Sequence, residues 1–454
     1  MAWLTLDPIT RRRWHRFTRI KRGYYSLWIL VIAMVLAIFA PLLAESRALL
    51  VWYQGKLYIP TFQYLDMKTF NQEPPAAWDT GDIEVEYFRL QREWQLEKRM
   101  FERERDALRG NAQGLAELER KYPNRNHFVV MPLIPWNPYQ NDFWSNEILN
   151  EIQVELDAAR PDKAERIALR DGLDELAQAI RDGRLSAMLK DPTKAPNGKL
   201  KSLAQTGALA SLKNLGALPP GPPSLARQHY LGTDSQGRDV ASRLLYGFRI
   251  SIFFSLFLVM TGQIIGTAIG SLQGYLGGRF DILSQRLIEI LIAIPFLYVV
   301  IVVAALIQPG FWMLLGILAL FQWIGITFFM RTEMYREKTR EYCLAAKSYG
   351  ASHLRIVFRH LLPNCLTPLV TFTPFAVVGA IFTLTGLDYL GYGLPAPTPS
   401  WGELIGQALQ AENRDKLWLT LAPFTVLTVT LVLVVFIGES VREAFDPKQY
   451  ARYE

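Results

Sequence analysis

The 454-residue sequence contains only two cysteines, Cys343 and Cys365, and five histidines. Both cysteines flank a basic segment that we assign below to the cytoplasm, where structural disulfides are rare, so we expect none. His127 and His229 are too far apart in sequence to form a metal-ligand pair by spacing. No Ser/His/Asp or Cys/His arrangement indicates catalysis, and the sequence predicts neither a catalytic nor a metal site.

Nucleotide-binding motifs are also absent. The sequence has neither a G-x-x-x-x-G-K-[ST] loop nor a Rossmann glycine pattern. We therefore expect no cofactor on this chain. If the protein performs work that needs ATP and magnesium, another subunit must bind them.

Half of the residues are hydrophobic, and many of them gather in six long apolar runs that contain almost no charged residues. Each run is close to the length needed to cross a bilayer. The sequence predicts an all-α integral membrane protein with six transmembrane helices. The runs are Leu27–Leu43, Ile250–Leu272, Leu287–Ile307, Phe311–Met330, Leu366–Leu384 and Leu417–Ile437.

Two interpretations fit the first run. It could be a signal peptide cleaved near Ala44, or a retained helix whose aromatic start, with Tyr24, Tyr25 and Trp28, lies at the membrane interface. We favour retention. In the second run, Gly262, Gly266 and Gly270 recur at every fourth position, a pattern typical of close helix packing in lipid.

Lysine and arginine set the expected orientation. They gather in the N-terminal tail, residues 1–26, and in the loop 331–364, as cytoplasmic segments do. We predict that residues 27–44 form the first transmembrane helix, that 250–438 form a membrane core, and that the tail 439–454 is cytoplasmic. Segment 45–230 is then external, which in a Gram-negative cell means the periplasm. The net charge of +7 reflects this membrane-flanking charge and does not indicate nucleic-acid binding.

The external segment 45–230 has nearly balanced charge. Residues 51–60 predict a small β-hairpin that turns at Gln54-Gly55. The stretch 82–190 predicts a helical hairpin or a short coiled coil made of Asp82–Tyr122 and Asn146–Lys190, and 193–217 is rich in linker residues. Its many carboxylates are typical of solvated helical faces and do not indicate catalysis.

The basic loop 331–364 predicts a short helix–turn–helix. Glu341–Tyr349 forms the first helix, and Gly350 ends it. The second helix, Ser352–Leu362, has Ser352 as a possible N-cap and is stopped by Pro363. Its predicted apolar face consists of Leu354, Val357 and Leu361.

This loop resembles the EAA coupling loop of permease subunits in ABC importers, which docks on the ATPase. Leu344 stands where the pattern has Glu, and His360 where it has Ile. An ordinary basic cytoplasmic loop is the alternative interpretation. The candidate coupling residues are Glu341, Leu344, Ala345, Ala346, Gly350, Ala351, Arg355 and Pro363.

A longer motif precedes the second apolar run, in the amphipathic entry segment 231–249. Its spacing fits neither an EF-hand nor a P-loop, so a structural turn is the simplest interpretation of the motif by itself. Leu231–Ser251 closely resembles the signature LGTDxxGRDVxSRLLYGxRIS of dipeptide/oligopeptide ABC permeases. Its candidate residues are Gly232, Asp234, Gly237, Arg238, Asp239 and Arg243.

Three further segments resemble the same family: Gly274–Asp281, Leu384–Ile405 and Gly438–Lys448. Several details are similar to the microcin C importer subgroup. The stretch 80–200 is expected to be an enlargement outside the resemblance. The candidate external gate residues are Asp388, Pro397, Pro399, Trp401 and Gly402.

The resemblance implies a type I ABC importer (MetI-like) permease for peptides or peptide-like compounds in the bacterial inner membrane. It also implies a second homologous permease, ATP-binding subunits and a periplasmic solute-binding protein as partners, and alternating access as the mechanism. Two other classes of membrane protein are alternative interpretations. A secondary transporter or channel would need ionisable residues deep in the membrane, and a membrane-anchored scaffold would act through the external helices.

Overall fold

The computed structural model describes residues 8–70, 85, 87–107, 112–139, 221–225, 228–307 and 310–445. The chain divides into two compact units. The first comprises Met1–Ala37, Tyr246–Gly406 and Pro423–Glu454, and the second comprises Ile38–Leu245 and Gln407–Ala422. The predicted helix Asn146–Lys190 and the stretch 193–217 lie outside the described residues.

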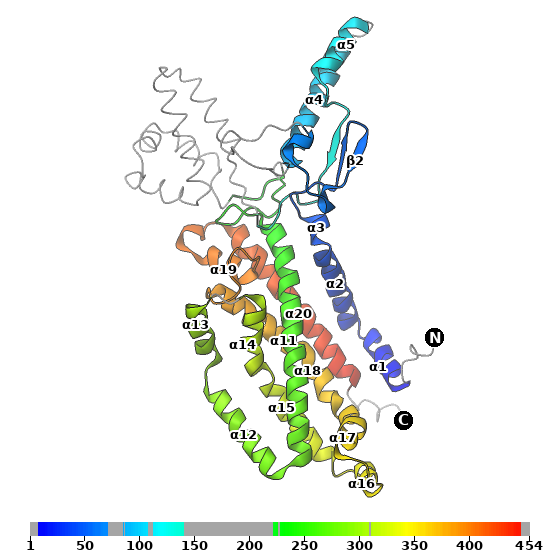
Figure 1. The fold of residues 1–454 in the computed structure, drawn as a ribbon, viewed down its shortest axis with the longest axis vertical. Coiled ribbons are helices and arrows are strands. Elements are labelled where there is room, and N and C mark those ends of the chain that lie inside the picture. Colours follow the sequence, from blue (N-terminus) through cyan, green and yellow to red (C-terminus); the bar gives the residue numbers. More distant parts are fainter. Residues whose placement is uncertain are drawn as a thin grey trace. The chain divides into compact units, whose positions relative to one another are not determined.

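Helices dominate the described part of the chain (Figure 1). Five of them are long and apolar enough to cross a membrane, and a sixth span results if a bent pair counts as one. The helices that carry the spans are α2 (Lys21–Ile38), α11 (Val240–Leu276), α14 (Phe311–Gln322) continuing into α15 (Ile324–Glu337), α18 (Leu366–Tyr389) and α20 (Leu417–Phe445). This confirms the predicted all-α membrane architecture.

The bent pair is the third span. It consists of α12 (Gly278–Ala293) and α13 (Phe296–Leu306), which meet at an angle of 65°. Pro295 lies between them, and proline both fixes its own φ and disfavours a helical conformation in the residue before it. The predicted run Leu287–Ile307 therefore covers α13 but only the second half of α12.

Glycines bring α11 against α15 in the first unit. A Cβ atom on Gly266, Gly270 or Gly274 would lie 2.4, 2.5 and 2.5 Å from the carbonyl oxygens of Trp323, Thr327 and Arg331 respectively. The three glycines and the three facing carbonyl groups both recur at every fourth residue, so the two helices stay in contact over two turns. The Thr327 hydroxyl donates to Gly266 O at 3.3 Å and to Trp323 O at 2.9 Å. The glycine pattern thus forms a close helix–helix contact, as the sequence predicts.

The second unit contains a three-stranded antiparallel sheet in the order β2-β1-β3. Strands β1 (Leu50–Tyr53) and β2 (Lys56–Tyr58) form the predicted hairpin. Its turn residues Gln54 and Gly55 have φ of 47° and 78°, the left-handed conformation that a two-residue hairpin turn requires. Strand β3 (Phe128–Val130) pairs with β1 and was not predicted from the sequence.

One face of this sheet packs on the helix α4 (Tyr87–Ala107), which is followed by α5 (Ala112–Lys121). Val51, Tyr53 and Val129 form a core with Leu90 and Trp94. The predicted helical run Asp82–Tyr122 is confirmed where the structure describes it. Beside the core, His127 accepts a hydrogen bond at Nε2 from Gln54 N and lies with Nδ1 3.2 Å from Asn124 Oδ1.

Candidate functional site

The basic loop 331–364 lies at one end of the first unit (Figure 1). Its first helix, α16 (Glu341–Ser348), matches the prediction, and Gly350 follows with φ of 76°. Glycine adopts this left-handed conformation without strain, which explains why the helix ends there. The Ala351 N–H then donates to Ala346 O at 3.1 Å, as in a Schellman turn.

The second half of the loop differs from the prediction. Only α17 (His353–Arg355) is α-helical, and it continues as a π-helix over Ile356–Leu361 and a 3-10 turn over Leu362–Cys365. Pro363 does not stop the helix. It occupies the first turn of the 3-10 segment, where its missing N–H costs no hydrogen bond, and the chain enters α18 directly.

Two further details of the second helix are corrected. Ser352 stands at the N-cap position, but its side chain makes no capping hydrogen bond. Leu354 is 65% exposed, whereas Ile356, Val357 and Leu361 are buried. A π-helix has a wider turn than an α-helix, so the α-helical period by which Leu354, Val357 and Leu361 would share one face does not hold here.

The loop has a buried base and an exposed outer surface. Cys343 of α16 packs with Val357 and Leu361 against Met330 and Met334 of α15. The two cysteines lie in this same cluster, and both are free thiols. Tyr342 donates to Glu337 Oε2 at 2.9 Å, and burial, with this hydrogen bond to a carboxylate, raises the pKa of Tyr342 to about 12.

The outer surface carries the candidate coupling residues. Leu344 is 52% exposed and Tyr349 is 92% exposed. A Cβ atom on Gly350 would meet no atom of the described residues within 4 Å. Glu341, Ala345, Arg355 and Pro363 are also exposed, and Ala346 and Ala351 are partly buried. The motif therefore presents an open, largely apolar surface on a packed support.

Residues 231–245 of the signature segment lie in the second unit, and the charged side chains among them are buried. Asp234 receives hydrogen bonds at Oδ1 from the backbone N–H groups of Gln236 and Arg238, each at 2.9 Å. Its Oδ2 receives the Arg238 guanidinium, with Nε at 2.8 Å and an N–O distance of 2.7 Å to Nη2. Arg243 approaches the same oxygen at 3.5 Å and donates to Pro138 O at 3.3 Å. These charged side chains are at most 1% exposed.

Asp239 begins α11 as its N-cap. Its Oδ1 accepts from Ser242 N at 2.7 Å, and its Oδ2 lies 2.8 Å from His229 Nδ1. The His229 ring stacks on Trp136 at a centroid distance of 4.3 Å. Residues on both sides of 140–220 are thus joined by the same network. His229 and Trp136 were not identified from the sequence as part of it.

Two glycines shape this segment. Gly232 and Gly237 have φ of 76° and 78°. A Cβ atom on Gly232 would lie 2.6 Å from Gly221 O and 2.8 Å from the Trp418 ring. Both observations match the simplest interpretation of the motif, a structural turn, and show why glycine is required in it.

The candidate gate residues come together at the end of α18, at the other end of the first unit from the basic loop (Figure 1). Asp388 accepts from Leu394 N at 2.7 Å and from the Ser400 hydroxyl. Ser400 in turn accepts from Gly402 N at 3.1 Å at the start of α19 (Trp401–Leu409). Trp401 is fully buried, and its ring lies against Gly247 and Phe248.

Close approach explains Gly402, because its Cβ atom would lie 2.1 Å from Thr385 O. Pro399 is buried and Pro397 is exposed. The segment is therefore closed by internal contacts around Asp388. Ser400, which links Asp388 to α19, was missed in the sequence.

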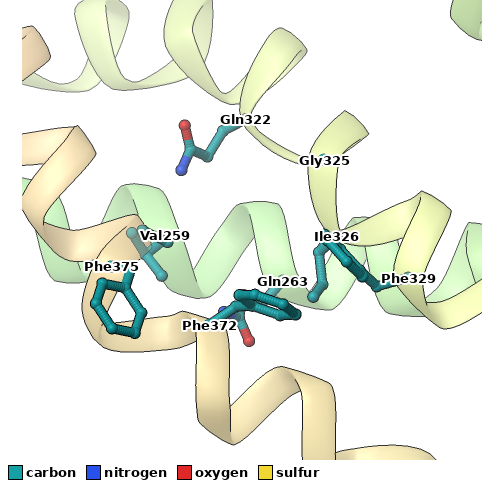
Figure 2. Close-up of a pocket in the computed structure, with 9 residues that line it drawn as sticks. Val259, Gln263, Gln322, Gly325, Ile326, Phe329, Phe372 and Phe375 are labelled. Atoms are coloured by element: carbon teal, nitrogen blue, oxygen red, sulfur yellow. The ribbon is translucent and has the colours of Figure 1, made fainter. Parts of the chain in front are cut away.

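A cavity of about 230 Å³ lies between α11, α14, α15 and α18 (Figure 2). Gln263 and Gln322 are its only amide side chains, and Phe329, Phe372 and Phe375 supply its aromatic walls. Gln263 Nε2 donates to Thr373 Oγ1 at 2.8 Å. Gly325 adds no side chain to the wall, α14 and α15 break at Trp323, and Pro374 lies inside α18 next to the lining residue Phe375.

Comparison with known proteins assigns the family. Residues 266–449 match the model of the binding-protein-dependent transport system inner membrane component, and residues 9–74 match the N-terminal TM domain of oligopeptide transport permease C. The peptidoglycan transport system permease protein YejE of Agrobacterium fabrum is 32% identical over 98% of this chain and 95% of its own length. The inner membrane ABC transporter permease protein YejE of Escherichia coli is 32% identical over 98% of both.

A third relative matches a shorter part of this chain. The oligopeptide transport system permease protein OppC of Lactococcus lactis is 37% identical over 50% of this chain and 78% of its own. The two YejE alignments extend through 80–200, which the sequence had placed outside the resemblance, so this stretch is shared with those relatives. The predicted resemblance to dipeptide/oligopeptide permeases is confirmed. The chain belongs to the family of binding-protein-dependent transport system inner-membrane components, the permease subunits of ABC importers, which have no ATPase site of their own.

Proposed function

We propose that this permease moves peptides or peptide-like compounds into the cytoplasm, driven by ATP hydrolysis on separate subunits. The relatives named for oligopeptide and peptidoglycan transport support this substrate class. The observation that carries the proposal is the basic loop, which presents exposed Leu344, Ala345 and Tyr349 on a buried base. Exposed apolar residues on a rigid support are typical of a docking surface.

The proposed partners are ATP-binding subunits, a second homologous permease and a periplasmic solute-binding protein. The family description names the binding protein directly. In this arrangement the loop 331–364 and both termini are cytoplasmic, and segment 45–230 is periplasmic. The concentration of arginine and lysine in the N-terminal tail and in the loop supports this orientation.

The mechanism we propose is alternating access. ATP binding closes the ATPase pair, α16 moves with it, and the helices of the first unit change from an inward-facing to an outward-facing arrangement. The ATPase biases this equilibrium only if it binds the two arrangements with different affinity. The Phe-lined cavity and the Asp388 segment lie on the helices that would have to move.

The external segment would contact the solute-binding protein. Its sheet exposes Trp52 and Phe128, which stack across β1 and β3 at 6.5 Å, on the face opposite the α4 core. Deletion of 80–200 should then weaken the affinity of the complex for its binding protein and reduce uptake. Unchanged affinity and uptake would mean that this stretch has no part in delivery.

The decisive experiment is purification of the tagged permease from its native cell. An ATP-binding subunit and a second permease should co-purify, and a channel or scaffold would bring neither. Gly350→Glu and Ala345→Glu should both abolish uptake while the protein remains in the membrane. Ala345→Glu carries no left-handed backbone strain, and Gly350→Asn, which tolerates that conformation, is the matched control for strain. Unchanged uptake and ATPase stimulation in both Glu variants would refute docking at this surface.

A further inference from the structure

The turn between α11 and α12 lies at the same end of the first unit as the basic loop (Figure 1). Gly277 and Gly278 form it with φ of 65° and 56°, the left-handed region that glycine tolerates. Three residues later, Asp281 is only 6% exposed. A buried carboxylate needs partners, and its partners come from another helix.

Those partners lie on α15. Arg331 donates two hydrogen bonds to the Asp281 carboxylate, from Nε at 2.6 Å and from Nη2 at 2.7 Å. The Tyr335 hydroxyl donates to Asp281 Oδ2 at 2.6 Å. A planar guanidinium with two parallel bonds to one carboxylate fixes both distance and orientation. The start of α12 is therefore held rigidly to α15.

Lys338, just beyond α15, holds the end of α11. Its ammonium donates to Gly274 O at 2.7 Å and lies 4.2 Å from the centre of the Tyr335 ring. A Cβ atom on Gly274 would lie 2.5 Å from Arg331 O, so the backbones themselves touch here. We call Asp281, Arg331, Tyr335 and Lys338 the Asp281 cluster.

A further contact connects this turn to the second half of the basic loop, beyond α16. The Tyr275 hydroxyl lies 2.7 Å from His353 Nδ1, and the two rings meet edge to face at 5.6 Å. His353 is the first residue of α17. Near Tyr275, Gln273 is fully buried, and its amide has no hydrogen-bond partner among the described residues.

We propose that the turn Gly274–Asp281 is a second coupling element: the Asp281 cluster and the Tyr275–His353 contact make α11, the start of α12 and the basic loop move as one body. Its residues position helices and touch no substrate. This inference rests on the proposed docking of the loop on the ATPase. A movement of α16 would then reach two transmembrane helices besides α18, which the loop enters directly.

The test uses the whole transporter, co-expressed with the partners that co-purify and reconstituted in vesicles. ATP hydrolysis and uptake of a defined mixture of short peptides are measured together. Asp281→Asn, Arg331→Lys and Tyr335→Phe should each raise the ATP consumed per peptide several-fold, with normal amounts of assembled complex. Arg279→Gln changes an exposed charge of the same turn that forms no ion pair within the described part of the chain, and it should leave the ratio unchanged.

A ratio that stays normal in all three variants would overturn the proposal. The exchange Asp281→Arg with Arg331→Asp should restore the ratio in part if the ion pair itself matters. Gly350→Glu distinguishes this inference from the docking of the loop on which it rests. Uncoupling by Gly350→Glu but not by Asp281→Asn refutes only this inference, whereas uptake that is normal in both refutes the docking as well.

Cross-linking tests the one-body movement directly. Tyr275→Cys with His353→Cys, joined by a short reagent that carries two thiol-reactive groups, should retain uptake, because the two positions keep their separation through the cycle. Loss of uptake on cross-linking, recovered when a cleavable reagent is reduced, would show that the turn and the loop must separate. Each single cysteine treated with the same reagent is the control.

Discussion

Two family motifs of this chain, the signature segment and the basic loop, differ in how far solvent reaches them. In the signature segment, Asp234, Arg238 and Arg243 are charged and at most 1% exposed. In the basic loop, Leu344 and Tyr349 are apolar or aromatic and are 52% and 92% exposed. Charged residues are usually exposed and large apolar residues are often buried, so both motifs show the opposite of the usual burial. The buried charges hold a fold together, whereas the exposed apolar residues are available to a partner.

In these two motifs, the specificity of the sequence match does not indicate which motif faces a partner. The signature is the longer and more specific sequence match, yet its side chains face one another and the backbone of Pro138. The degenerate coupling motif lacks its usual Glu, yet it forms the accessible surface. A motif recognised in a sequence can thus mark a structural requirement, and the functional contact can lie in the weaker motif.

The largest effect is expected from removing one charge of the signature. Arg238→Met leaves Asp234 buried without its closest cation, which costs about 3–5 kcal/mol in comparable buried pairs. We expect loss of most of the folded protein from the membrane, measured by size-exclusion chromatography of a fluorescent fusion. Arg355→Met, on the exposed loop, should keep normal amounts. Equal amounts of folded protein for the two variants would contradict the difference in burial between the two motifs.

The second prediction compares two glycines with the same backbone angle. Gly232 and Gly350 both have φ of 76°, but only Gly232 is enclosed. Gly350→Ala should cost only the left-handed strain, about 1 kcal/mol. Gly232→Ala adds overpacking against Gly221 O and Trp418, typically about 1–3 kcal/mol more. Thermal unfolding in detergent measures both, and a similar loss in each would contradict the enclosed geometry.

Thiol labelling tests the two faces of the basic loop. Cys343 is 5% exposed, and burial raises the pKa of its thiol. Because the thiolate is the reactive form, alkylation of Cys343 should be slow and should need a higher pH than a free cysteine, whose pKa is about 8.5. Tyr349→Cys should react fast in the isolated permease and slowly in the assembled transporter. Mass spectrometry resolves the two sites, and fast labelling of Cys343 at neutral pH would contradict its burial.

The smallest effect concerns the missing Glu of the coupling motif. Leu344→Glu restores it at an exposed position, so the free energy of unfolding should change by less than about 0.5 kcal/mol. We expect uptake to fall moderately, because an apolar contact surface gains a charge that must be desolvated on docking. Leu344→Met, which keeps the surface apolar, is the control. A rise in uptake with Glu would show that the leucine weakens docking.

Much of the site could be predicted from local patterns. The end of α16 at Gly350 and the hairpin turn at Gln54-Gly55 follow from backbone preferences of single residues. Leu354 was assigned wrongly because the π-helix Ile356–Leu361 changes which residues share a face, and Pro363 was assigned wrongly because it begins a 3-10 turn that leads into α18. Helix period is a local rule, and here packing against Met330 and Met334 overrides it.

The sequence by itself determined the membrane class, the number of candidate spans, the family and the position of both motifs along the chain. Those features depend on hydropathy, charge and residue spacing, which are properties of short segments. Only the tertiary structure decided that Asp234, Arg238 and Asp239 are buried and that Asp281 meets Arg331, 50 residues away. Such partners are chosen by helix packing, because a buried charge is stable only where another element brings it an opposite charge.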